Sequence, residues 1–188
     1  MNNQKKYGLF DIANNHPSLY FMAKDCGIDF IFVDREHGFV SERELHDLML
    51  LGNQIGMPTY VRVPCLNKET VSKTLDAGAA GVMIPMLETK EMALELVKYG
   101  MYPPVGSRGY AGGAHTNYGP SGSHRKHMEE ANGRVLLIAQ IETVKGVENI
   151  EDILSVPGIG AVMIGPSDLS ISLGIPDDEM NETELAAI

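Results

Sequence analysis

The sequence lacks tryptophan, has two cysteines in 188 residues, and contains no run near the roughly 20 apolar residues of a membrane-spanning helix. Cys26 and Cys65 cannot form a disulfide framework for a chain of this size, and neither lies in a CxxC pair. We therefore expect two reduced, buried thiols. Residues 1–6 are polar and no apolar segment of a signal peptide follows them. These absences predict a cytoplasmic protein that does not bind membranes.

Basic residues are also scarce. Fifteen Lys and Arg against 25 Asp and Glu give a formal net charge of −10 and a pI near 5.0. Because the basic residues are not clustered, such a chain repels phosphate backbones, and nucleic acid is not expected as a partner. The 44% of hydrophobic residues is enough for one substantial core but hardly for two, so we expect a single domain over residues 1–188.

Short segments rich in β-branched and apolar residues alternate with segments of helical spacing. The former are apolar on both faces, as strands buried between helices must be. Several helical segments have N-terminal signals, such as the capping box of Ser41 and Glu44 and the cap residue Asn67. The alternation predicts an α/β fold with a parallel sheet. The five strongest predicted strands are residues 29–34, 58–63, 81–86, 135–142 and 160–165.

The spacing of these strands suggests two more. One gap is twice as long as the others, which predicts a strand near residues 104–110, and residues 7–12 predict another at the N-terminus. Polar residues follow several strands, and a closed (β/α)8 TIM barrel gathers all such strand ends at one mouth, whereas an open doubly wound sheet spreads them along an edge. A full barrel needs about 250 residues. With an apparent helix start at residues 181–188, the barrel is expected to be truncated before its eighth strand, or completed by another chain.

Glu142 and Asp168 are candidate metal ligands because each follows a strongly apolar strand. Burial of a carboxylate without a counter-charge is expensive, and a cation is the simplest compensation. Two carboxylates with open positions suit a hard divalent ion such as Mg²⁺ or Mn²⁺. The alternative is that each acid pairs with a local arginine, or that Ser167 or Asp168 caps the next helix.

Two further polar residues lie at predicted strand ends. Arg62 carries a permanent charge within an apolar strand and needs an anion, either a structural carboxylate or a substrate oxygen. His37 follows Asp34 and Glu36, and it could be a base oriented by a carboxylate or a histidine satisfied at a strand end. The sequence leaves both alternatives open.

Residues 106–122 contain six glycines but neither a GxGxxG motif nor a Walker lysine, so we interpret them as a flexible active-site loop. His124 and His127 lie three residues apart on a predicted helix, where a solvated polar face is the favoured interpretation. An enzyme that forms a Schiff base with its substrate would need a lysine at a strand end. None of the strong strands has one, although Lys145 lies three residues after Glu142.

Six linked motifs, spread over essentially the whole chain, resemble those of the HpcH/HpaI aldolase family in order and spacing. They are DREHG (34–38), YVRVP (60–64), LDAGAAG (75–81), YPPVGSRG (102–109), QIET (140–143) and GPSDLSISLG (165–174).

The resemblance implies a (β/α)8 barrel that cleaves a 4-hydroxy-2-oxo acid into pyruvate and an aldehyde through a pyruvate enolate. It implies a divalent metal, Mg²⁺ or Mn²⁺ with Co²⁺ as a further option, and a homo-oligomer, trimeric or hexameric. The resemblance implies that Glu142 and Asp168 bind the metal and that Arg62 stabilises the enolate. It implies that Gln140 contacts the substrate and that the backbone amides of Ser167 and Asp168 bind its carboxylate. His37 would be the acid/base residue, supported by Asp76 across a subunit interface or by Asp34.

One departure from the family pattern supports an alternative. Arg35 stands where a small or apolar residue is expected, and a second cation at the mouth would suit a more anionic acceptor. The same enolate could then serve a citrate-forming synthase. A third hypothesis, a non-catalytic barrel that binds oxo acids, conflicts with the joint presence of Glu142, Asp168, Arg62 and His37.

Overall fold

The computed structural model describes residues 5–119 and 122–176, which form six strands and eight α-helices with one 3₁₀ turn. The strands are β1 (Gly8–Asp11), β2 (Phe30–Asp34), β3 (Thr59–Arg62), β4 (Gly81–Ile84), β5 (Leu136–Ile141) and β6 (Ile159–Ile164). The helices are α1 (Pro17–Asp25), α2 (Glu42–Ile55), α3 (Lys68–Asp76), α4 (Lys90–Gly100), η1 (Ala114–Thr116), α5 (His124–Arg134), α6 (Val144–Glu148), α7 (Ile150–Leu154) and α8 (Pro166–Ser172).

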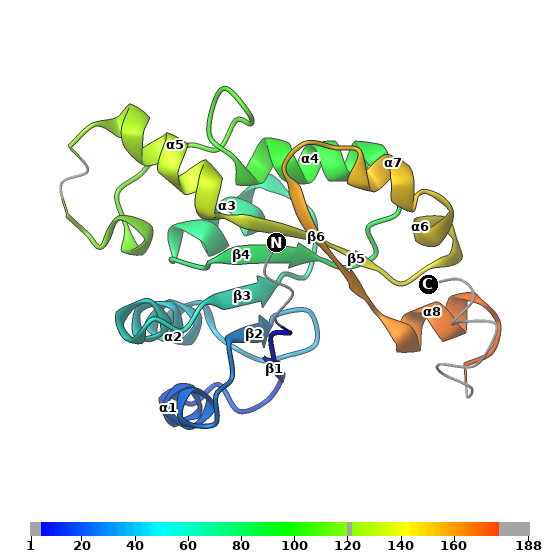
Figure 1. Ribbon diagram of the computed structural model, residues 1–188, viewed down its shortest axis with the longest axis horizontal. Helices are drawn as coiled ribbons and strands as arrows, with labels where there is room; N and C mark the ends of the chain where they lie inside the picture. The colour runs from blue at the N-terminus through cyan, green and yellow to red at the C-terminus, as the bar shows by residue number, and fades with distance from the viewer. Residues whose placement is uncertain (1–4, 120–121, 177–188) are drawn as a thin grey trace.

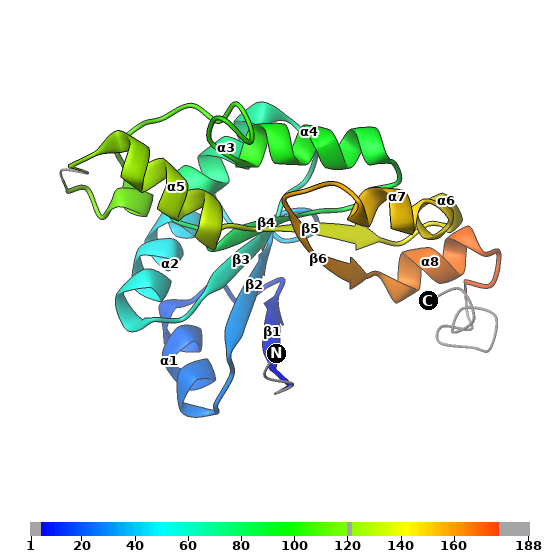
Figure 2. The same cartoon turned by 45° about the horizontal axis from the view of Figure 1, so that its top comes forward.

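All six strands are parallel and lie in chain order, β1 to β6, in one sheet. Figures 1 and 2 show a curled sheet whose connecting helices pack along its outer side. A doubly wound sheet would reverse its strand order at a switch point, and none occurs among the described strands. The parallel α/β prediction is confirmed as a curled half-barrel. The predicted helix at residues 181–188 lies outside the described residues.

Local sequence explains several helix starts. Ser41 and Glu44 form the predicted capping box at α2, and the side chains of Asn67 and Thr89 cap α3 and α4. The buried stripes of these helices join the outer faces of the strands in one core. No helix in the described part of the chain is both long and apolar enough to cross a membrane.

The inner, concave face of the sheet carries an aromatic cluster. Phe32 contacts Phe10, Phe30 and Tyr60 with ring centroids 5.3–5.7 Å apart. Buried Met83 and Ile138 extend this cluster toward β4 and β5. Alternate side chains of each strand thus pack under the helices on one face and within the curl on the other, which explains why the strand sequences are apolar on both faces.

The predicted strand at residues 104–110 is wrong. Gly81 pairs directly with Leu136, so β4 and β5 are neighbours and no strand intervenes among the described residues. Equal spacing of βα units misled the prediction, since this gap holds η1 and α5 instead. Pro103, Pro104 and the nearby glycines also disfavour a ladder.

The predicted burial of the two cysteines is also wrong. Cys26 and Cys65 are exposed, because one follows α1 at its C-cap and the other lies in the loop after β3.

Candidate active site

A cavity of about 330 Å³ lies at the carboxyl ends of the strands, where β1, β3, β5 and β6 meet α8. It contains most of the residues that the sequence singled out. Its polar lining comes from three segments of the chain, the ends of β3 and β5 and the start of α8, and Phe10 forms an apolar wall. The predicted residues that line it are Arg62, Gln140, Glu142, Ser167 and Asp168.

Arg62, the last residue of β3, is held by a carboxylate at the end of β2. Its Nε and Nη2 donate to the two oxygens of Asp34, each at 2.7 Å, and its Nη1 lies 3.2 Å from Glu36 Oε2. Its guanidinium also lies 5.0 Å from the Phe10 ring centroid. The structure therefore identifies the anion that Arg62 needs as a structural carboxylate, while the cavity leaves it access to a substrate oxygen.

Asp34 is fully buried, which by itself would raise its pKa. The hydrogen bonds and charge of Arg62, together with the backbone N–H groups of Glu36 and His37, outweigh burial and lower the pKa of Asp34. Burial dominates at Glu36 and raises its pKa, with Arg62 opposing that effect. Asp34 therefore stays ionised, and its two hydrogen bonds keep the Arg62 guanidinium in one orientation.

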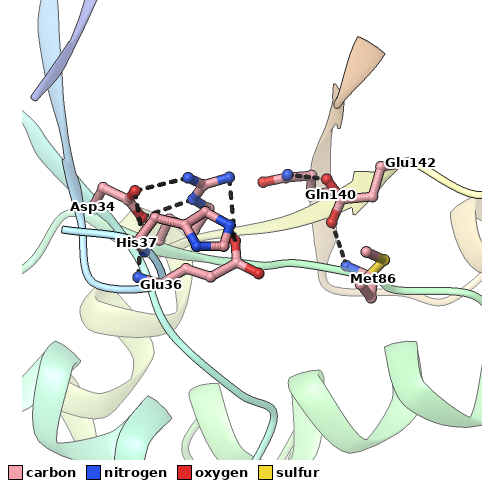
Figure 3. Close-up of polar contacts among 7 residues, drawn as sticks. Asp34, Glu36, His37, Met86, Gln140 and Glu142 are labelled. Carbon is pink, nitrogen blue, oxygen red and sulfur yellow. Dashed lines mark hydrogen bonds and ion pairs between the residues drawn. The ribbon is translucent and has the colours of Figure 1, made fainter. Parts of the chain in front are cut away.

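Glu142 follows β5 and is only 2% exposed. Its Oε1 accepts a 2.6 Å hydrogen bond from the backbone N–H of Met86, and its Oε2 accepts one from the side-chain amide of Gln140 (Figure 3). No basic side chain within the described residues forms an ion pair with it. The alternative that Glu142 pairs with a local arginine is therefore not realised.

Asp168 and Ser167 lie in the first turn of α8. The N-cap of this helix is Gly165, which has no capping side chain, so neither Ser167 nor Asp168 acts as the cap. Pro166 has no N–H. The N–H groups of Ser167 and Asp168 lie in the first turn of α8, where no preceding helical carbonyl is available to accept from them. These groups lie on the wall of the cavity, where they could bind a carboxylate.

The donor set fits a hard cation. Glu142 is a buried carboxylate without a counter-ion, Asp168 lines the same cavity, and the buried Oε1 of Gln140 has no hydrogen-bond partner. All of these donors are oxygens, as Mg²⁺ and Mn²⁺ prefer. Over residues 5–119 and 122–176, no group of three His, Cys, Asp or Glu side chains could hold a metal alone. Water or substrate oxygens would have to complete the coordination.

His37 lies at the rim, with its side chain 65% exposed and its Nε2 3.8 Å from Glu36 Oε2. Figure 3 shows Asp34, Glu36 and His37 on one side, opposite Gln140, Glu142 and Met86. Asp34 contacts His37 only through the backbone N–H, so Glu36 is the carboxylate nearest to the imidazole.

Asp76 is not part of this cavity. It ends α3 at the amino-terminal end of the sheet, where its Oδ1 accepts a 2.6 Å hydrogen bond from Arg108. The described part of the glycine-rich segment, residues 106–119, contributes Arg108 and His115 to the surroundings of Asp76, so within this chain it is not a loop of this cavity (Figure 1). Lys145 forms an ion pair with Glu88 and does not line the cavity.

Sequence reasoning missed three contributors to the site. Met86 adopts a left-handed φ of 50°, uncommon for a non-glycine residue, and directs its N–H at Glu142. A Cβ on Gly165 would lie 2.4 Å from Glu142 Oε2, so glycine here leaves the carboxylate its position. Glu36 was seen only as a neighbour of His37, although it also contacts Arg62. The DREHG and GPSD motifs were the available signals.

A parallel βα half-barrel with acid and arginine side chains at its carboxyl mouth defines the class of TIM-barrel-like enzymes and binding proteins. Comparison with known proteins is more specific. The model of the HpcH/HpaI aldolase/citrate lyase family matches residues 6–188, and the chain belongs to this family.

The chain is similar to several characterised members. It is 37% identical over 158 residues to 2-keto-3-deoxy-L-rhamnonate aldolase of Klebsiella pneumoniae, covering 84% of this chain but 58% of the relative. The HpcH/HpaI aldolase structure from Desulfitobacterium hafniense superposes with a TM-score of 0.94 at 33% identity, over 98% of this chain and 71% of that one. The citrate synthase SbnG gives a TM-score of 0.88 at 30% identity, over 99% and 71%.

Proposed function

We propose that this chain carries the catalytic mouth of a metal-dependent aldolase that cleaves 4-hydroxy-2-oxo acids into pyruvate and an aldehyde. The observation that carries the proposal is one cavity in which a fixed guanidinium, Arg62 at the end of β3, meets two carboxylates, Glu142 after β5 and Asp168 in the first turn of α8. The chain spans less than two thirds of the length of the aldolase it matches. The activity of the whole protein is therefore part of the proposal, as are a closed (β/α)8 barrel and a trimeric or hexameric homo-oligomer.

Glu142 and Asp168 would hold a divalent ion, Mg²⁺ or Mn²⁺, with Co²⁺ as a further option. When bound, such an ion supplies Lewis acidity that stabilises negative charge on substrate oxygens. The carboxylate of Glu142 is already oriented by the Met86 N–H and the Gln140 amide, so it pays little reorganisation on binding a cation.

Cleavage of the C3–C4 bond leaves its electron pair on C3 as a pyruvate enolate, whose charge lies on the C2 oxygen. Arg62 is aligned to stabilise this charge because Asp34 fixes the guanidinium from behind. Gln140 would contact the oxo acid, and the backbone N–H groups of Ser167 and Asp168 would bind its carboxylate. Protonation of C3 then yields pyruvate.

His37 would accept the proton of the C4 hydroxyl, directly or through a water, as C4 becomes the aldehyde carbon. Its exposed position at the rim suits a base that meets the variable part of the substrate. Asp76 lies at the opposite, amino-terminal end of the sheet, so it could support His37 only from a neighbouring copy. Asp34 would act by holding the loop backbone through the His37 N–H.

The test is pyruvate release, measured by a coupled assay over several 4-hydroxy-2-oxo acids with Mn²⁺ and with EDTA. We expect turnover that EDTA abolishes, and loss of that turnover in Glu142→Ala and Asp168→Ala. Asp152→Ala, an acid on α7 away from the cavity, is the matched control and should stay active. Full activity of either site variant after metal dialysis would contradict the metal assignment.

A citrate-forming synthase is the second candidate because of the similarity to SbnG. Arg35, which the sequence offers in support of this candidate, forms an ion pair with the largely exposed Glu42 at 2.5 Å. Condensation of an oxo acid with an acyl donor, without pyruvate release from hydroxy-oxo acids, would favour the synthase. Oxalate binding without any turnover would favour a non-catalytic oxo-acid-binding protein.

A further inference from the structure

A second cavity, of about 350 Å³, lies at the opposite, amino-terminal end of the sheet. Its walls come from the ends of α2 and α3, the start of β4, η1 and α5. In Figure 1, α5 lies at the end of the molecule from which β4 and β5 begin, far along the strands from their carboxyl ends. This volume is in the range of small-molecule pockets. None of its lining residues belongs to the candidate active site.

Arg108 is the central charged residue of this cavity, although it is only 4% exposed. Its Nη2 donates to Asp76 at 2.6 Å, and its guanidinium lies 4.7 Å from the Tyr102 ring centroid. Its Nε–H is buried and has no hydrogen-bond partner. Because a guanidinium does not deprotonate in proteins, this buried donor remains unsatisfied unless something enters the cavity.

Three further basic side chains lie around Arg108. His127 lines the cavity and has a buried Nε2 without a partner. His115 donates from Nδ1 to the backbone carbonyl of Asp76, and its ring centroid is 5.6 Å from that of His127. Arg134, the last residue of α5, stands exposed at the rim. The prediction of a solvated face therefore holds for His124 but is wrong for His127, which packs on Tyr102 and Tyr110.

The charges of this cavity are unbalanced. Among the described residues, its lining includes two arginines and two histidines but no Asp or Glu. Asp76, which lies outside the lining, accepts from one edge of the Arg108 guanidinium and is 4.0 Å from His115 Nδ1, so one carboxylate faces four basic side chains. Burial lowers the pKa of His127, and the neighbouring His115, Arg134 and Arg108 lower it further, as expected in a region of positive potential.

We infer that this cavity binds a compact oxyanion, either inorganic phosphate or the phosphate or carboxylate group of a small metabolite. The anion would accept from the two unsatisfied donors, Arg108 Nε and protonated or suitably tautomeric His127 Nε2, with Arg134 closing the entrance. Arg108, His127 and Arg134 together offer donors to the acceptor oxygens of a tetrahedral or planar oxyanion. The inference does not depend on the aldolase proposal, since it uses other residues at the other end of the sheet.

Isothermal titration of the full chain with inorganic phosphate, in EDTA and at constant ionic strength, tests this inference. We expect saturable binding at one site per chain that weakens about tenfold in Arg134→Gln and in His127→Phe, because each removes one charge-assisted or buried donor. Arg125→Gln is the matched control, since it makes the same charge change on α5 but does not line the cavity. It should leave the affinity unchanged.

Two further measurements make the outcome unambiguous. Phosphate should raise the unfolding temperature of the wild type and of Arg125→Gln but much less that of Arg134→Gln. Arg134 is exposed, so this variant tests the site even if His127→Phe disturbs the aromatic packing. Parallel titrations with glycerol 3-phosphate and acetate distinguish a free ion, a phosphorylated metabolite and a carboxylate as the source. Absence of saturable binding to all three probes, or equal losses in Arg125→Gln and Arg134→Gln, would overturn the inference.

Discussion

Asp34 and Arg62 occupy paired positions in the parallel register of β2 and β3, and two hydrogen bonds of 2.7 Å join their side chains. The pair is positioned by the sheet itself rather than by a loop. A fork-to-fork contact of this kind fixes both the location and the plane of the guanidinium. Any substrate oxygen in the cavity therefore meets a cation whose geometry is set before binding.

Arg62→Lys should retain the charge but lose the planar fork, and should lower kcat more than it changes KM. Complete loss of such a stabiliser in Arg62→Ala typically costs about 2.7 to 4 kcal/mol of transition-state stabilisation. Steady-state pyruvate release measures both variants, with the exposed Arg43→Lys on α2 as the control. A change confined to KM would show that Arg62 binds substrate without stabilising the enolate.

The pH dependence of unfolding should report the Asp34–Arg62 pair. Because the folded pKa of Asp34 is lowered from 3.8, the pair contributes stability above that value, and the contribution is lost as the pH falls through the folded pKa. Asp34→Asn should therefore be less stable at pH 7, with a weaker further loss on acidification below about pH 4.

Glu36 provides the opposite comparison. Its folded pKa is raised above 4.5, so its contribution is present below that value and is lost as the pH rises through the folded pKa. Glu36→Gln retains Asp34, so its free energy of unfolding should still fall on acidification below about pH 4, whereas that fall should be weaker in Asp34→Asn. Chemical denaturation at a series of pH values measures both, and identical profiles for the two variants would contradict the assignment.

Gly165→Ala should impair metal activation because its new Cβ would lie 2.4 Å from Glu142 Oε2 and 2.8 Å from Glu142 Cβ. The backbone of Gly165 has an ordinary negative φ, so the effect is a displaced carboxylate rather than a strained turn. We expect a raised Mn²⁺ requirement for pyruvate release. Gly133→Ala, where a Cβ meets no atom within 4 Å, is the control, and equal behaviour of the two variants would exclude this role for Gly165.

His37→Ala should slow retro-aldol cleavage by about 10² to 10⁴-fold, the usual contribution of a general base. Exchange of pyruvate methyl protons and decarboxylation of oxaloacetate should be relatively spared, because neither requires deprotonation of a C4 hydroxyl. Asp76→Asn should give a milder loss of cleavage. Equal losses in all three reactions would instead mean that His37 supports the metal site or the fold.

The strands and caps could be predicted because their signals are local. The strand of residues 30–34 is recognised by its own apolar composition, and Asn67 caps the helix that it begins. The strand expected at 104–110 failed because it rested on a count of spacings rather than on its own residues. Local composition was thus the stronger guide.

The site was predictable only as a set of strand ends. Arg62 was known to need an anion, but its choice of Asp34 depends on a register that composition does not specify. The contact of Met86 with Glu142 depends on an uncommon φ, and the burial of Arg108 depends on where the segment after α4 returns. These are tertiary relationships between residues far apart in the chain.

The sequential strand order also has a kinetic consequence. Four of the five strand pairings join residues 21–28 positions apart, as in Tyr60 with Gly81, whereas Gly81 and Leu136 are 55 apart. Closing this longer loop costs about 1 kcal/mol more in chain entropy, so we expect β1–β4 to assemble before β5 docks. Pulsed hydrogen exchange during refolding would then protect the amides that join β2 to β3 ahead of the amides that join β5 to the β4 side, such as Leu136 N–H, which donates to the carbonyl of Ala80, so that the β4–β5 ladder is the last part of the sheet to form.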